Sequence, residues 1–188
     1  CSYFQPSDCY DRLKPVPYTE MEGDWVRTIA EELPNDMRLT SWTVGTHNSR
    51  LGSANRDCCL ENAYADDLVF GLCPSTPAVA DYLVNLVNDL ANRNQFDSIE
   101  LETFDYFHGT GFGWHHQKIH ADLGPLGEFL LGLCFCTNCR SVANEFDVDV
   151  GRARRTVRNT IDAIVDGAVS SDDAKHWLDD HPTVAAYA

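Results

Sequence analysis

Three cysteines within residues 134–139 place the strongest constraint on how this chain can fold. In LCFCTNCR, Cys134, Cys136 and Cys139 form the pattern C-x-C-x-x-C. Thiols this close in sequence converge on one metal ion more readily than they pair with one another, and a tetrahedral site needs a fourth ligand. Cys73, in GLCPSTP, is the best candidate for that ligand. The pattern predicts a closed, structural zinc site, with reduced free thiols or a disulfide as the alternatives.

Length and composition indicate a chain that folds around a hydrophobic core and does not span a membrane. With 188 residues, 44% of them hydrophobic, it can build a core without a disulfide framework. The first residue is Cys1 rather than Met, which suggests a segment of a longer protein. The sequence has no stretch of about 18 apolar residues and no basic, apolar leader. We therefore expect a cytoplasmic location and no membrane partner.

The charge balance is strongly acidic. There are 29 Asp and Glu residues against 14 Lys and Arg, which gives a formal net charge of −15. Such a surface repels phosphates, so no nucleic-acid partner is expected. The preference for Asp and the near absence of Lys are typical of proteins from salt-loving organisms, and an ordinary acidic surface is the alternative.

Hydrophobic periodicity predicts alternating helices and strands. A helix over residues 24–33 is followed by a strand over 37–44, and a helix over 76–93 by a strand over 96–104. The apolar face of the second helix is formed by Val79, Leu83, Leu86, Val87 and Leu90. Further helices are expected in GPLGEFLLGL, from Asp149 onward and in DAKHWLDD. Helix-loop-strand units of this kind favour a parallel sheet.

The expected fold class is α/β, and the expected architecture is a partial (β/α)8 TIM barrel with parallel strands and flanking helices. Residues 1–188 would form a single domain that carries the cysteine cluster at 134–139. An open doubly wound sheet is the competing architecture, but no Gly-rich phosphate loop follows either predicted strand.

A barrel would give two glutamates a catalytic position. Glu100 and Glu102 alternate with Ile99 and Leu101, so the glutamates would point into the lumen and the apolar residues toward the helices. Glu102 is nearer the strand end at which barrel active sites lie. Burial there would raise its pKa and suit it to general acid/base catalysis, with Glu100 beside it, about 6.6 Å away along the strand. A glutamate held in a salt bridge, for example with Arg50, is the structural alternative.

Residues at the ends of the predicted strands could bind a substrate. His47 and Asn48 follow the first strand, where they would reach the same rim as Glu102, and Trp42 could stack on a sugar ring. The segment after Glu102 is rich in histidine, and His108, His115 and His116 would wall the same site. The alternative for these residues is an ordinary structural role.

Two segments resemble barrel glycoside hydrolases. LCPSTPAVADYLVNLVNDLANRNQFDSIELETFDY is similar to the part of those enzymes in which a Pro-headed helix leads into a strand ending in the catalytic acidic residue, here Glu102. The cysteines of CPSTP and CFCTNC resemble the structural zinc ligands of zinc-containing β-galactosidases, which implies all four cysteines as ligands. Over residues 37–165, the combination is most similar to an uncharacterised bacterial and haloarchaeal group of barrel glycosidases.

The sequence therefore predicts a carbohydrate-active hydrolase with Glu102 as general acid/base, a carbohydrate substrate and a structural zinc ion. One alternative is a barrel that binds sugars without catalysis. Another is a metal-dependent hydrolase that uses Glu102 with His108, His115 or His116 as ligands.

Overall fold

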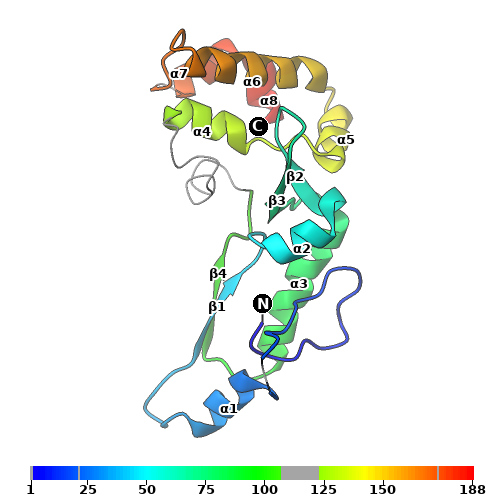
Figure 1. Ribbon diagram of the computed structural model, residues 1–188, viewed down its shortest axis with the longest axis vertical. Helices are drawn as coiled ribbons and strands as arrows, with labels where there is room; N and C mark the ends of the chain where they lie inside the picture. The colour runs from blue at the N-terminus through cyan, green and yellow to red at the C-terminus, as the bar shows by residue number, and fades with distance from the viewer. Residues whose placement is uncertain (1, 21, 107–122, 173) are drawn as a thin grey trace.

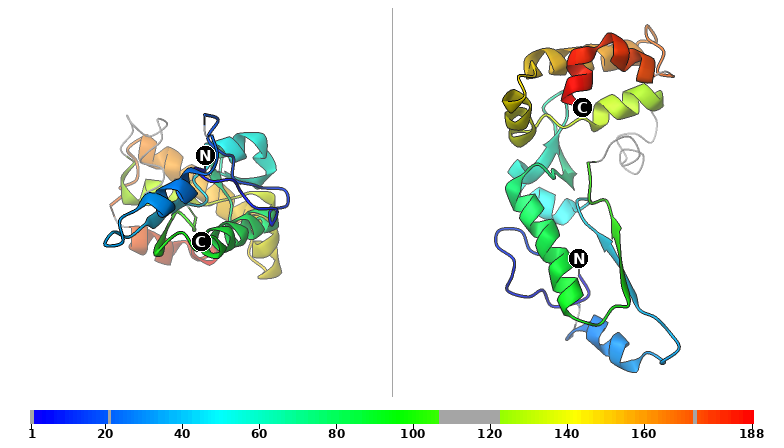
Figure 2. Two further views of the ribbon diagram at one scale, coloured as in Figure 1. Left: turned by 90° about the horizontal axis from the view of Figure 1, so that it is seen from below. Right: turned by 180° about the vertical axis from the view of Figure 1, so that it is seen from behind.

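The computed structural model describes residues 2–20, 22–106, 123–172 and 174–188, and Figure 1 shows an elongated molecule. The amino-terminal half forms one end, the carboxyl-terminal helices form the other, and the views of Figure 2 agree. In chain order the elements are α1 (Trp25–Glu32), β1 (Thr40–Val44), α2 (Ser49–Ala54), the 3-10 helix η1 (Arg56–Cys58), β2 (Cys59–Glu61), β3 (Asp67–Leu72), α3 (Pro77–Asn92), β4 (Ser98–Glu102), α4 (Gly124–Gly132), α5 (Thr137–Glu145), α6 (Val150–Val165), α7 (Ala174–Asp180) and α8 (Pro182–Tyr187).

The amino-terminal half is built on α3 and on a parallel pair formed by β1 and β4. Pro77 stands in the first turn of α3, where its fixed φ suits a helix and its missing N–H costs nothing. Every third or fourth residue of the helix is apolar and buried, against side chains of the amino-terminal segment. This cluster contains Val79, Leu83, Leu86 and Leu90 of α3 together with Phe4 and Leu13. The predicted helix and the parallel pairing of the two predicted strands are confirmed.

A buried carboxylate fastens the amino-terminal segment to α3. Asp89 accepts hydrogen bonds from the backbone N–H of Ser7 at 3.0 Å and from the hydroxyl of Tyr10 at 3.1 Å. Arg93 forms ion pairs with Asp89 at 3.4 Å and with Asp24 at 2.8 Å. Burial, and then the nearby charge of Asp89, raise the pKa of Tyr10. The network pairs the carboxylate of Asp89, which would be costly to bury alone, while the Nε atom of Arg93 stays without a hydrogen bond.

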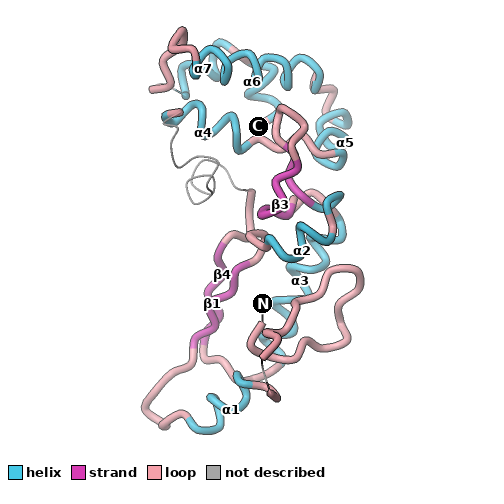
Figure 3. Tube along the Cα trace, in the orientation of Figure 1, coloured by secondary structure: helices cyan, strands magenta, loops and turns pink. Residues whose placement is uncertain are grey.

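An antiparallel hairpin of β2 and β3 lies between the two ends of the molecule (Figure 3). Its turn is shaped by Asn62, whose side-chain oxygen accepts hydrogen bonds from the backbone of Tyr64 at 2.9 Å and of Asp66 at 3.0 Å. Ala65 takes a positive φ of 72° in this turn. The hairpin was not predicted, because β2 has only three residues and a bulge disturbs its register with β3.

The carboxyl-terminal end is helical, as the sequence predicts. Helices α4, α6 and α8 enclose a second core around Leu130, Phe135, Val157 and Val184. Asp149 caps α6, since its carboxylate accepts a hydrogen bond from the backbone N–H of Arg152 at 2.9 Å. Among the described helices, none combines the length and the apolar character needed to cross a membrane.

The predicted partial TIM barrel is wrong. The described residues contain one parallel pair of strands and one antiparallel pair, in separate sheets of a mixed α/β structure. After β1 the chain turns back in the β2–β3 hairpin, and the described residues beyond β4 form helices, so no third parallel strand extends the β1–β4 pair. Without a barrel there is no lumen for Glu100 and Glu102.

Gly52 provides a test of how tightly α2 packs on β3. A Cβ atom at this position would lie 2.0 Å from the backbone oxygen of Val69 and 3.1 Å from the sulfur of Cys59. Because the backbone of β3 could make room for this atom only at a large cost in energy, we expect Gly52→Ala to lower the free energy of unfolding by about 1–3 kcal/mol or more. Urea denaturation measures this change. The control is Gly151→Ala in α6, whose Cβ would meet nothing closer than 3.4 Å, and equal stability of the two variants would contradict the packing.

Candidate metal centre

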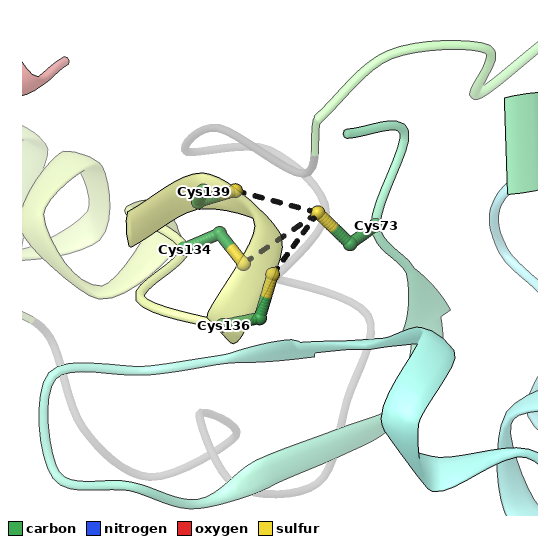
Figure 4. Close-up of side chains that lie close together, drawn as sticks. All are labelled: Cys73, Cys134, Cys136 and Cys139. Atoms are coloured by element: carbon green, nitrogen blue, oxygen red, sulfur yellow. Dashed lines mark hydrogen bonds between the residues drawn. The ribbon is translucent and has the colours of Figure 1, made fainter. Parts of the chain in front are cut away.

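Four cysteines from two distant segments of the chain meet between the β2–β3 hairpin and the helical end. Cys73 directly follows β3, Cys134 and Cys136 lie in the connection between α4 and α5, and Cys139 is in the first turn of α5. Figure 4 shows their sulfur atoms pointing toward one another. Cys73, Cys134 and Cys136 are buried, and Cys139 is partly exposed. The predicted ligands are thus brought together at one place.

The sulfur positions suit a metal ion better than a disulfide. The Sγ atom of Cys73 lies 3.4 Å from that of Cys139, 3.6 Å from that of Cys136 and 3.7 Å from that of Cys134. All four sulfur atoms lie within 4.8 Å of one another. A tetrahedron with zinc–sulfur bonds of about 2.3 Å has sulfur atoms about 3.8 Å apart. A disulfide needs about 2.05 Å, so these are free thiols at metal-ligand spacing.

The cluster favours negative charge on two sulfur atoms, because a hydrogen bond from Cys134 is the largest cause that lowers the pKa of both Cys136 and Cys139. Hydrogen bonds from Cys134 and then Cys139 lower the pKa of Cys136, and the backbone N–H of Cys139 adds to the effect. The same network raises the pKa of Cys73, first through its hydrogen bond with Cys134. Four thiolates this close would repel one another strongly, so the remaining thiols would need a nearby cation in order to ionise.

The backbone around the cysteines is held by contacts from other elements. The hydroxyl of Tyr187 donates to the carbonyl oxygen of Cys134 at 2.6 Å, and the backbone N–H of Phe135 donates to that of Glu61 at 2.6 Å. On the other side, the amide of Asn138 donates to the hydroxyl of Thr76 at 2.9 Å. These contacts fix the ligand loops before any metal binds, which reduces the entropy lost on binding.

Sequence reasoning did not single out these supporting residues. Tyr187 lies in α8, 53 residues after Cys134, and nothing in HPTVAAYA indicates that contact. Tyr106 is a further example, because its hydroxyl lies 3.9 Å from the sulfur of Cys139. Only the tertiary structure reveals either residue.

The two predicted catalytic glutamates are not placed as the barrel hypothesis required. Glu100 is exposed and Glu102 is half-buried, on the open face of the β1–β4 pair. The carboxylate of Glu102 accepts a hydrogen bond from the indole nitrogen of Trp42 at 2.6 Å. Ile99 and Leu101 were both expected to pack against helices. Ile99 packs on the core that contains the apolar face of α3, whereas Leu101 is 51% exposed. General acid/base catalysis by Glu102 stays a prediction. If the Glu102→Gln variant hydrolyses the carbohydrate substrate as fast as the wild type does, the prediction is contradicted.

Three of the predicted substrate-binding residues line one groove. Trp42, His47 and Asn48 border a groove of about 740 Å³ between β1, α3 and the amino-terminal segment, and neither Glu100 nor Glu102 lines it. The side chain of Asn48 also caps α2 by accepting from the backbone of Leu51. His108, His115 and His116 lie outside the described residues.

No protein-family model matches the chain, and no curated protein or solved structure is significantly similar to it.

Proposed function

We propose that this protein binds one zinc ion through Cys73, Cys134, Cys136 and Cys139, and that the ion has a structural role. The observation that supports the proposal is the convergence of four sulfur atoms within 4.8 Å of one another. An all-thiolate, tetrahedral donor set suits zinc or an iron centre, and it suits magnesium or calcium poorly. Zinc is favoured because closed sites with four cysteine ligands are a usual structural form of this metal.

The position of the site explains what the ion would do. Cys73 belongs to the connection between β3 and α3, while the other ligands belong to the connection between α4 and α5 and to the first turn of α5. The ion would therefore join the amino-terminal half to the carboxyl-terminal helices. Four protein ligands leave no open coordination position for a substrate or water, so the site would stabilise the fold and would not perform catalysis.

Elemental analysis of the purified chain tests the proposal. We expect one zinc per chain in the wild type and in Cys9→Ser, a thiol outside the cluster, and no bound zinc in Cys136→Ser. Iron in place of zinc, or zinc retained by Cys136→Ser, would overturn it. Zinc lost from His116→Ala while Cys136→Ser retains it would support the metal-dependent hydrolase instead.

Acid should release the metal. Thiols bind zinc as thiolates, so protons compete with the ion as the pH falls. We expect the zinc affinity to fall by about tenfold per pH unit for each thiol that must lose its proton on binding. A chromophoric zinc indicator, added at a series of pH values, measures the release. A zinc affinity that does not change between neutral and mildly acidic pH would contradict thiolate ligation.

A further inference from the structure

The groove beside β1 has an apolar floor that the zinc proposal does not use. Leu86 and Leu90 of α3, together with Phe4 and Phe96, line it from the first core. One wall carries Tyr3 and Trp25, whose rings are stacked with centroids 5.9 Å apart and an interplanar angle of 9°. Ile29 and Val44 also line the groove, and both are exposed. Exposed apolar side chains that gather in a concave surface mark a binding site for an apolar group.

The charge of the groove differs from that of the rest of the protein. The chain has 29 acidic residues among 188, yet no Asp or Glu occurs among the described residues that line the groove. Among the described residues that line the groove, Arg50 is the one that carries a full charge, and it follows the end of β1 in the chain, as His47 does. Arg50 forms no ion pair with any described carboxylate within 4.0 Å. One end of the groove is therefore suited to an anion.

The polar groups of the groove are largely engaged with the protein itself. The hydroxyl of Ser2 donates to the carbonyl oxygen of Phe4, that of Thr40 shares a hydrogen bond with Ser98, and that of Ser41 shares one with Thr43. A sugar presents hydroxyls around its whole ring and would find few free partners along the floor. An apolar body with a single anionic group fits the lining better.

We propose that the groove binds a fatty-acid-like ligand, which is an alkyl chain with one carboxylate. The alkyl chain lies along β1 against Leu86, Leu90 and Phe96, and the carboxylate pairs with the guanidinium of Arg50. The four residue steps of β1 span about 13 Å, and a volume near 740 Å³ falls within the usual range of ligand sites. This proposal does not depend on the zinc site.

Calorimetric titration of the full chain with dodecanoate, below the concentration at which it forms micelles, tests the proposal. We expect saturable binding that Arg50→Gln weakens by about fivefold, since an ion pair of an exposed arginine contributes up to about 1 kcal/mol. Arg152→Gln removes the same charge from an exposed position on α6 and should leave the affinity unchanged. Ile29→Glu, which adds a carboxylate to the wall, should weaken binding further.

Dodecanol, glucuronate and a neutral oligosaccharide serve as comparison ligands. Dodecanol has the same chain without the charge and should bind more weakly than dodecanoate, while glucuronate has the charge without the alkyl chain and should not bind measurably. No saturable binding of dodecanoate, or equal affinity of the wild type and Arg50→Gln, would overturn the proposal. Glucuronate or a neutral oligosaccharide binding in place of dodecanoate would make the groove a saccharide site. Zinc content, measured in each variant, should be the same throughout.

Discussion

Cys136→Ser is expected to lose its metal and to lower the free energy of unfolding by about 4 kcal/mol or more. The reason is the length of chain that the site closes, since Cys73 and Cys134 are 61 residues apart. By the chain-entropy relation for cross-links, a link closing a loop of this size is worth about 4 kcal/mol. Metal binding adds to this, because the unfolded chain does not hold the ligands together and the binding energy becomes folding energy.

Urea denaturation, followed by circular dichroism, measures the loss, and hydrogen exchange locates it. Protection should fall first in α5 and in the α4–α5 connection, which contain three of the ligands. Removing zinc from the wild type with a chelator should give the same midpoint as the variant. Cys9→Ser should unfold as the wild type does, because Cys9 is exposed and outside the cluster. Equal midpoints for Cys136→Ser and the zinc-loaded wild type would contradict a structural role for the ion.

Phe135→Ala is expected to cost about 3–5 kcal/mol of stability, in the range measured for large aromatic residues in cores. Phe135 is fully buried between two of the cysteines. Its ring stacks on Tyr187 with centroids 4.5 Å apart, and the guanidinium of Arg154 lies 5.8 Å from its centre. Truncation would leave a cavity at the point where the metal site meets the helical core.

The matched control is Phe146→Ala, because Phe146 follows α5 and is 75% exposed. We expect that variant to stay within about 0.5 kcal/mol of the wild type. Zinc content should be measured in both variants, so that loss of the metal is distinguished from loss of packing. A similar stability for Phe135→Ala and Phe146→Ala would show that the helical core does not depend on Phe135.

Local features of this fold could be predicted, because local rules determine them. The 3.6-residue period of α3, its first-turn proline and the Asp149 cap of α6 all act within one element. The cysteine cluster could also be predicted, since three of its ligands are close in sequence and only Cys73 had to be found elsewhere. Such patterns can be recognised in the sequence because they do not depend on the overall architecture.

The architecture could not be predicted in the same way. The parallel pairing of β1 and β4 is compatible with a barrel, but a barrel needs further parallel strands, and no local rule specifies their number. The β2–β3 hairpin depends on a turn at Asn62 and on pairing across a bulge, which the three residues of β2 barely indicate. The expectation that Glu100 and Glu102 point into a lumen followed from the barrel, so that expectation was wrong for the same reason.

On the two-stranded sheet, the charges of these glutamates affect how the sheet edge could associate with another molecule. Within the described part of the chain β4 pairs with β1 alone, so its other edge presents backbone groups that a strand of another molecule could bind. Leu101 and Trp42 are 51% and 72% exposed on this small sheet and would favour such an association. Two like charges spaced along β4 would repel a second copy brought edge to edge. The charges of Glu100 and Glu102 would therefore oppose pairing of this edge with a second copy of the chain.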